Sequence, residues 1–134
     1  MPDAVTTNVQ INGAKNYQAT FTNISDGTGE TAVIKIDKST LVNELGKEPL
    51  ELAIKRVQWS MQGFSSVRIL WDHTTDDVGI VLTGQYGDIM YDKCAPLQDP
   101  NSTGGTGDIL FTTIGASATA TYTITLWVVK VGGL

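Results

Sequence analysis

The stretch Ala120-Thr-Tyr-Thr-Ile-Thr-Leu-Trp-Val-Val-Lys-Val131 decides the fold of this chain. Every second residue from Tyr122 to Val128 is apolar, and threonines fill the first positions between them. This period of two predicts a β-strand with one buried face. Trp127 and Val129 then replace the threonines, which predicts burial on both faces at that end, as in a central strand or a subunit contact.

The same period of two recurs nearer the N-terminus. Apolar and polar residues alternate in 17–21, and Ala32, Ile34 and Ile36 share one phase in 32–36. Between them, Asp26-Gly-Thr-Gly29 is rich in residues that tolerate a positive φ angle. We therefore expect the two segments to form the arms of a β-hairpin.

Residues 50–61 keep the alternation but change its phase. Leu50, Leu52 and Ile54 share one phase, and Val57, Trp59 and Met61 share the other. One extra residue at Lys55–Arg56 would leave both sets on the same side of the strand, which is the effect of a β-bulge. A helix is the rival interpretation, but the β-branched and aromatic residues favour a strand.

The remaining segments are shorter. Strands are predicted at 67–71, 78–82 and 108–113, whereas the Gly- and Pro-containing residues 84–108 are expected to form a loop. A helix of about one to two turns competes at 39–46, with Ser39 or Thr40 as its cap and Gly46 at its end. Such a helix is too short to organise a domain.

These elements predict one domain that spans residues 1–134. The length suits a single domain, and the 41% of hydrophobic residues suffice for one core. Strands joined by Gly-rich turns, without alternating helices, predict an all-β antiparallel β-sandwich, jelly-roll-like, with at most one short helix. Residues 1–13 are expected to form an extended arm or an edge strand that augments a neighbouring sheet.

Charge and composition disfavour a nucleic acid or a membrane as partner. The net charge is −5 and the nine basic residues are scattered, which disfavours nucleic-acid binding. The first residues lack the basic and apolar regions of a signal peptide, and no apolar run reaches the length of a membrane span. Synthesis in a cytoplasm is therefore expected. Cys94 is the only cysteine, so no internal disulfide can form, and it is interpreted as a small apolar filler.

The only histidine, His73, lies in Asp72-His-Thr-Thr-Asp76-Asp77. An imidazole and several carboxylates suit a divalent cation if the loop folds back on itself. The same residues also suit a polar loop in which Asp and Thr supply turn hydrogen bonds, and this interpretation is preferred. A catalytic zinc would need further histidine or thiolate ligands that the chain does not offer nearby.

Three other motifs are weaker. Asp26–Glu30 is too short for a calcium loop, and Gly104–Asp108 lacks the Lys-Ser/Thr and the helix of a phosphate loop. Cys94 and His73 could pair as nucleophile and base only through a tertiary coincidence. We therefore expect no catalytic, cofactor-binding or metal-binding residue and no enzymatic activity.

The tryptophans and the C-terminal third suggest contacts rather than chemistry. Trp59, Trp71 and Trp127 lie in apolar runs, so core or interface packing is the favoured interpretation. A sugar-binding module would instead use exposed aromatics such as Tyr86, Tyr91 or Trp71. From Cys94 onward, the only charged residues are Asp99, Asp108 and Lys130. A long, Thr-rich surface with so few charges suits packing against other copies or another protein.

With these observations in place, the chain resembles a small virion structural protein of tailed bacteriophages, particularly those of marine bacteria. The stretches that carry the resemblance are Thr22–Glu30 (TNISDGTGE), Val57–Phe64 (VQWSMQGF), Leu70–Asp76 (LWDHTTD) and Asp99–Leu110 (DPNSTGGTGDIL). No catalytic motif comes with the resemblance.

The resemblance implies a capsid decoration, or cement, protein at the capsid surface of the virion, made in the host cytoplasm. Its expected partners are the major capsid protein and other copies of itself, with a trimer as the expected oligomer, and neither a nucleic acid nor a membrane. The alternatives are a head–tail or tail structural component, a carbohydrate-binding β-sandwich module and, least favoured, a small hydrolase.

Overall fold

The computed structural model describes residues 4–43, 46–49, 51–73, 75–91, 96–98, 105–115 and 117–131. The strands in chain order are β1 (Ala4–Asn12), β2 (Asn16–Asp26), β3 (Val33–Ile36), β4 (Glu51–Gln62), β5 (Ser66–Trp71), β6 (Asp77–Leu82), β7 (Tyr86–Met90), β8 (Ile109–Ile114) and β9 (Ala118–Val131). A short 3-10 helix, η1 (Lys38–Thr40), follows β3. The described part of the chain contains no helix with the length and apolar character needed to span a membrane.

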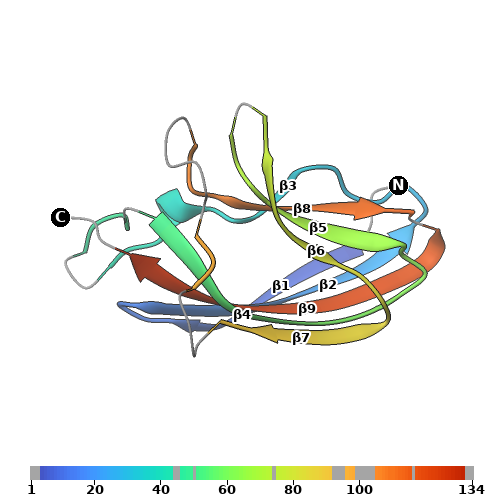
Figure 1. Ribbon diagram of the computed structural model, residues 1–134, viewed down its shortest axis with the longest axis horizontal. Coiled ribbons are helices and arrows are strands. Elements are labelled where there is room, and N and C mark those ends of the chain that lie inside the picture. Colours follow the sequence, from blue (N-terminus) through green and yellow to red (C-terminus); the bar gives the residue numbers. More distant parts are fainter. Residues whose placement is uncertain are drawn as a thin grey trace.

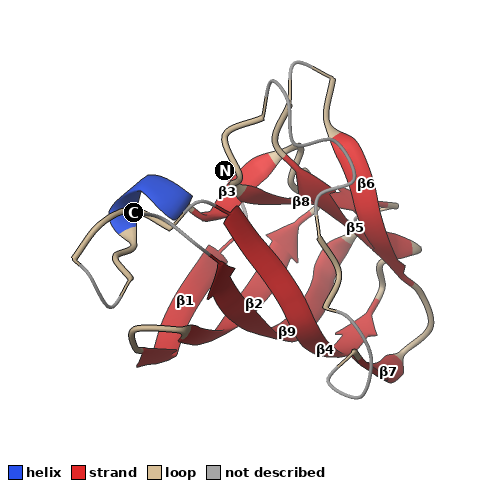
Figure 2. Cartoon of the chain, turned by 60° about the vertical axis from the view of Figure 1, so that its left-hand side comes forward, coloured by secondary structure: helices blue, strands red, loops and turns tan. Residues whose placement is uncertain are grey.

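The strands form two antiparallel sheets that face each other (Figures 1 and 2). Sheet A has the order β1-β2-β9-β4-β7, and sheet B has the order β3-β8-β5-β6. From β2 to β9 the chain changes sheet at every step except between β5 and β6, which is the strand order of a jelly roll. The predicted all-β, jelly-roll-like antiparallel sandwich is therefore confirmed.

The hairpin predicted from residues 17–21 and 32–36 is wrong. β2 pairs with β1 and β9 in sheet A, whereas β3 pairs with β8 in sheet B. The connection crosses between the sheets and is fixed to β8, where Glu30 N donates to Thr113 Oγ1 and Ala32 N donates to Thr112 Oγ1, both at 2.8 Å. Alternation and turn residues predict strands and a reversal, but they do not specify which strand becomes the neighbour.

The two long strands of sheet A follow the sequence closely. β9 lies between β2 and β4, so the predicted central position of the C-terminal stretch is confirmed. The predicted burial on both faces is only partly met, because Trp127 and Val129 on the outer face remain partly exposed. Against β9, the register of β4 shifts between Ile54 and Arg56, which confirms the predicted β-bulge. Because of this bulge, Leu52 and Ile54 face the same core as Val57 and Trp59.

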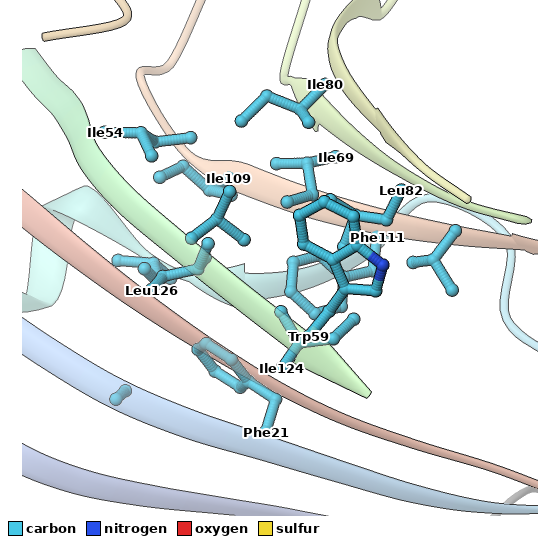
Figure 3. Close-up of a cluster of buried hydrophobic side chains, with 14 of the residues drawn as sticks. Phe21, Ile54, Trp59, Ile69, Ile80, Leu82, Ile109, Phe111, Ile124 and Leu126 are labelled. Carbon is cyan, nitrogen blue, oxygen red and sulfur yellow. The ribbon is translucent and has the colours of Figure 1, made fainter. Parts of the chain in front are cut away.

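The core fills the space between the sheets with side chains from alternate strand positions (Figure 3). Phe21 of sheet A meets Phe111 of sheet B edge to face, with ring centroids 5.3 Å apart. Trp59 lies across β7 at Gly87, where an added Cβ would come within 2.2 Å of the indole. A glycine at this position is therefore needed for the tryptophan to reach the core.

Two further predictions need correction. Residues 84–108 were expected to form a loop, but β7 lies within them as the edge strand next to β4. Gly87 gave this segment a loop-like composition, although its role is to make room for Trp59. In 39–46, the described residues contain only η1, which is capped by Asp37 through a bond from Ser39 N (3.0 Å) rather than by Ser39 or Thr40.

A buried charged side chain fixes each end of the sandwich. Near the start of β9, Glu30 accepts hydrogen bonds from Tyr122 Oη and Asn23 Nδ2 and pairs with Lys35 at 2.5 Å. At the other end, Lys130 Nζ donates to Asn12 Oδ1, Gly13 O and Val42 O at 2.6–2.8 Å. Burial lowers the pKa of Lys130. Each charge is satisfied by several partners, which offsets the cost of its burial.

Candidate interaction surfaces

The candidate metal loop after β5 is held together by its own carboxylates. His73 N donates to Asp76 Oδ1 (3.0 Å), and Thr106 Oγ1 donates to Asp72 Oδ2 (2.7 Å). The His73 side chain is 5% exposed, with Nε2 at 3.6 Å from Asp77 Oδ2. Within the described ranges, no three His, Cys, Asp or Glu residues come together in a way that could hold a metal ion. These contacts are those of a polar turn.

The candidate calcium segment Asp26–Glu30 divides between solvent and core. Asp26 is exposed, and its Oδ1 accepts hydrogen bonds from Thr28 N (3.1 Å) and Thr28 Oγ1 (2.7 Å). Glu30 is 6% exposed and takes part in the buried network described above. The two carboxylates therefore have separate structural tasks. Nothing local in the sequence identified Glu30, because its partner Tyr122 is 92 positions away.

The candidate phosphate loop leads into a strand, not a helix. Asp108 Oδ1 accepts a hydrogen bond from Lys38 N (2.8 Å), and β8 begins at the next residue. Burial raises the pKa of Asp108 above its usual value. A buried carboxylate facing a backbone N–H is unsuited to holding phosphate. Gly104 and Cys94 lie outside the described residues. The prediction about a pairing of Cys94 with His73 therefore also falls outside them.

The aromatic candidates divide into buried and exposed groups. Trp59 and Trp71 are 8% and 1% exposed, so core packing is confirmed for both. Tyr91 is partly buried and packs against the same core. Trp71 and Tyr91 therefore cannot form the open platform considered for sugar binding. Tyr86 is 70% exposed, and Trp127 is partly exposed on the outer face of sheet A.

The outer face of sheet B carries a row of apolar side chains that crosses all four strands. Inward-facing Ile69 and Phe111 belong to the central core, so their neighbours Leu70 and Leu110 point away from it. The strand register aligns Leu110 with Leu70 and with residues of β3 and β6 on the two sides. The resulting apolar row is Ile34–Leu110–Leu70–Val78.

Burial varies along the apolar row. Leu110 and Leu70 are 2% and 7% exposed, whereas Ile34 and Val78 at its ends are 52% and 48% exposed. Val81, further along β6 on the same face, is also 48% exposed. The sequence contained a signal for this face in Ile69-Leu-Trp71 and Ile109-Leu-Phe111, because consecutive apolar residues mark strands that are apolar on both faces.

The outer face of sheet A has the opposite character. The register of β2, β9, β4 and β7 aligns three rows of side chains, here called the polar grid. The rows are Gln18–Trp127–Arg56–Met90, Thr20–Thr125–Gln58–Asp88 and Thr22–Thr123–Ser60–Tyr86. Its two charged residues neutralise each other, because Arg56 binds Asp88 through Nε–Oδ1 (3.1 Å) and Nη2–Oδ2 (2.6 Å).

The electrostatics of the polar grid follow from this pair. The hydrogen bond from Arg56 lowers the pKa of Asp88, so the carboxylate stays ionised to a lower pH than an ordinary aspartate. The Arg56 guanidinium also lies over the Trp127 ring, 4.7 Å from its centroid. Asp88 and Trp127 thus hold Arg56 from two sides and fix the orientation of the group.

β1 is an edge strand of sheet A, and each of its nine residues is exposed. It carries no charged side chain, and Val5 and Val9 are 48% and 47% exposed. These valines lie opposite the buried Asn23 and Ala19 of β2, so they are on the core-facing side of sheet A. They nevertheless remain about half exposed, because the core does not reach as far as this edge strand. An uncharged edge strand with open backbone groups is a template for pairing with another chain. Residues 1–3 lie outside the described part.

No protein-family model matches the chain, and no curated protein matches it. Among solved structures, a mutant of the family 29 carbohydrate-binding module CBM29-2, studied for its mechanism of ligand recognition, aligns over 97% of this chain and 81% of its own, with 8% identity and a TM-score of 0.39. The capsular polysaccharide assembling protein CapF from Staphylococcus aureus aligns over 92% and 30%, with 12% identity and a TM-score of 0.23. Similarities this low do not bear on function.

Proposed function

We propose that this chain is a non-enzymatic structural protein of a tailed-phage virion, where it decorates the capsid and stabilises the shell by binding the major capsid protein. The observation that carries the proposal is the apolar row on the outer face of sheet B. The proposal therefore has two supports, the resemblance found in the sequence and a surface suited to contact with another protein. A decoration protein works through such a surface, because its task is to bind neighbouring subunits.

The two ends of the apolar row and the neighbouring Val81 provide binding energy. Ile34, Val78 and Val81 are each about half exposed. Full burial of an aliphatic side chain of this size is worth roughly 1.5–3 kcal/mol, so covering the exposed half contributes about 1 kcal/mol each. Repeated at many positions on a shell, contacts of this size stabilise the assembled state by mass action.

Arg68 lies beside the apolar row on the same face. It is exposed, and the register places it between Thr112 of β8 and Val81 of β6. An apolar patch with an arginine at its edge has the composition of many protein–protein interfaces. We expect Arg68 to meet a carboxylate or a backbone carbonyl of the capsid subunit.

The edge strand β1 supplies a second contact, between copies of this chain. Its open backbone groups and its overhanging Val5 and Val9 suit the addition of a strand from a neighbouring copy. The proposed trimer on the shell would use this edge. A position at the head–tail junction would use the same two contacts, and the distribution of the protein over the particle distinguishes the two.

The test is cosedimentation of the purified chain with phage heads that lack it. The variant Val78→Asp/Val81→Asp places two charges on the exposed part of sheet B, and we expect it to bind at least about 100-fold more weakly, since burying an unpaired charge is costly. Thr22→Asp/Ser60→Asp on the polar grid, at positions separated by β9, is the matched control and should bind like the wild type. Circular dichroism verifies that both variants fold.

Two results would refute the proposal. One is a wild-type chain that does not bind heads at any accessible concentration. The other is equal binding by the sheet B variant and its sheet A control, which would remove the apolar row from the interface. Binding confined to necks or tails would support a structural role in the virion but reject decoration of the shell.

A further inference from the structure

The polar grid on the outer face of sheet A is neutral although the protein as a whole is acidic. The net charge of the chain is −5, yet the twelve grid positions carry one positive and one negative side chain, and these two pair. The other positions are mainly hydroxyl and amide side chains. A surface of this kind offers many hydrogen bonds but attracts neither phosphates nor basic peptides.

The side chains of this face are held in place before any ligand arrives. Gln10 Oε1 accepts hydrogen bonds from Gln18 Nε2 (3.1 Å) and Thr20 Oγ1 (2.9 Å), and Thr20 Oγ1 lies 2.9 Å from Thr125 Oγ1. These bonds link β1, β2 and β9, and the pair Arg56–Asp88 links β4 and β7. Ordered polar groups lose little conformational freedom on binding, which favours affinity.

Two aromatic residues and two hollows lie on the same face. A hollow of about 250 Å³ lies beside Trp127 and is also lined by Ile11, Gln18 and Lys55. A second hollow of about 290 Å³ is lined by outward-facing Ser60, Gln62, Thr121 and Thr123, together with Gln85. Tyr86, 70% exposed, is opposite Ser60 on the neighbouring strand. The polar grid is thus hollowed at both ends, and an aromatic ring lies near each hollow.

We infer that the polar grid binds an uncharged oligosaccharide. A sugar ring presents an apolar C–H face, which packs against an aromatic ring, and a rim of hydroxyls that both donate and accept hydrogen bonds. Tyr86 and the face of the Trp127 ring that Arg56 does not cover suit the first feature, and Gln18, Gln58 and the charge-fixed Asp88 suit the second. Few aromatic contacts combined with well-placed polar groups are typical of small-ligand sites.

The dimensions of the grid favour a chain of sugars over a single one. Trp127 and Thr123 are four residues apart on β9, or about 13 Å at roughly 3.3 Å per residue. A ligand that contacts both hollows must bridge at least this distance. The ligand class is therefore an oligosaccharide or a polysaccharide segment. The paired charges of the polar grid favour one without carboxylate or sulfate groups.

This inference is independent of the proposed docking through sheet B. The outer faces of the two sheets point in opposite directions, as Figure 1 shows with sheet B above and sheet A below. A copy docked on a shell through the apolar row would leave the polar grid facing solvent. The two surfaces can therefore be removed separately by mutation.

The test is affinity electrophoresis of the purified chain through gels that contain a soluble neutral polysaccharide, with a glucan, a mannan and a galactan as the probes. Alginate and polygalacturonate serve as acidic counterparts. We expect retardation by at least one neutral polymer. Trp127→Ala should weaken binding at least about tenfold, and Tyr86→Ala should weaken it severalfold. Val81→Ala on sheet B is the matched control and should bind like the wild type.

Each outcome of the affinity electrophoresis either supports or refutes the sugar site. Retardation by a neutral polymer that is lost in Trp127→Ala and Tyr86→Ala, while circular dichroism remains native, supports the site. Failure of all three neutral polymers, preference for the acidic ones, or undiminished binding by Tyr86→Ala refutes it. Association of the chain with itself through this face, seen as a mass change abolished by Trp127→Ala, would also refute it. Head binding by Trp127→Ala is measured in parallel, so that loss of sugar binding and loss of docking are told apart.

Discussion

The outer faces of the two sheets differ although the same alternation of side chains produces both. Sheet A presents Thr, Gln, Ser and the pair Arg56–Asp88, whereas sheet B presents the apolar row Ile34–Leu110–Leu70–Val78. A polar face can remain in water at no cost, but an apolar face gains free energy when it is covered. The comparison shows that a sandwich with one core can carry two outer faces of opposite chemical character.

The largest expected difference between the two faces is in stability. Leu110→Ala should lower the free energy of unfolding by about 2–4 kcal/mol, because Leu110 is 2% exposed and truncation leaves a cavity. Thr123→Ala at an exposed position of the polar grid should change it by less than about 0.5 kcal/mol. Urea unfolding followed by tryptophan fluorescence measures both. Equal effects would mean that the outward-facing leucine is not packed.

A smaller difference is expected in surface hydrophobicity. Val78→Thr/Val81→Thr should reduce binding of an apolar fluorescent dye and any self-association, because it makes the edge of sheet B resemble sheet A. Stability should change by less than about 0.5 kcal/mol, since both side chains are about half exposed on an edge strand. Thr20→Val/Thr22→Val tests the reverse change and should increase dye binding. An unchanged dye signal in both variants would contradict the contrast between the faces.

The smallest expected effect is on the pH dependence of folding, and it has opposite signs at two aspartates. The pKa of Asp88 is lowered from 3.8, so the stability due to its pair with Arg56 is present above that pH and is lost as the pH falls through the folded-state pKa. The pKa of Asp108 is raised from 3.8 by burial, so the folded state binds more protons just above that pH. Stability therefore decreases as the pH rises through the window between 3.8 and the raised pKa.

Carboxyl NMR titration measures the pKa values of Asp88 and Asp108 directly. Asp88 should titrate below 3.8 and return toward it in Arg56→Ala, whereas Asp108 should titrate above 3.8. Asp108→Asn keeps an acceptor for Lys38 N while removing the charge, so its stability should not decrease across that window. Shifts in the same direction at both aspartates would contradict the structure.

The sequence predicted the strands better than their partners. The alternation in 17–21 and in the C-terminal stretch, and the phase change at Lys55–Arg56, identified β2, β9 and the bulge of β4, because burial on one face leaves a periodic trace in the chain. The pairing of β2 with β9 and of β3 with β8 left no such trace, which is why the hairpin prediction failed.

The surfaces could be predicted only in part. Tyr86 was identified as a candidate aromatic, whereas Trp127 was assigned to core or interface packing, because it lies in an apolar run. The polar grid depends on the register of four strands that are far apart in the sequence, so no local motif could reveal it. The apolar row left a local signal in two Ile-Leu-aromatic triplets, yet only the register shows that they are neighbours.

A side-chain-resolution cryo-EM map of the particle with this chain bound tests the central claim most directly. The account predicts that Ile34, Val78 and Val81 lie against the major capsid protein, with copies of the chain spread over the shell, and that Trp127 and Tyr86 face solvent. A map in which the polar grid contacts the shell and the apolar row faces solvent, or in which the chain is missing from the particle, would contradict it.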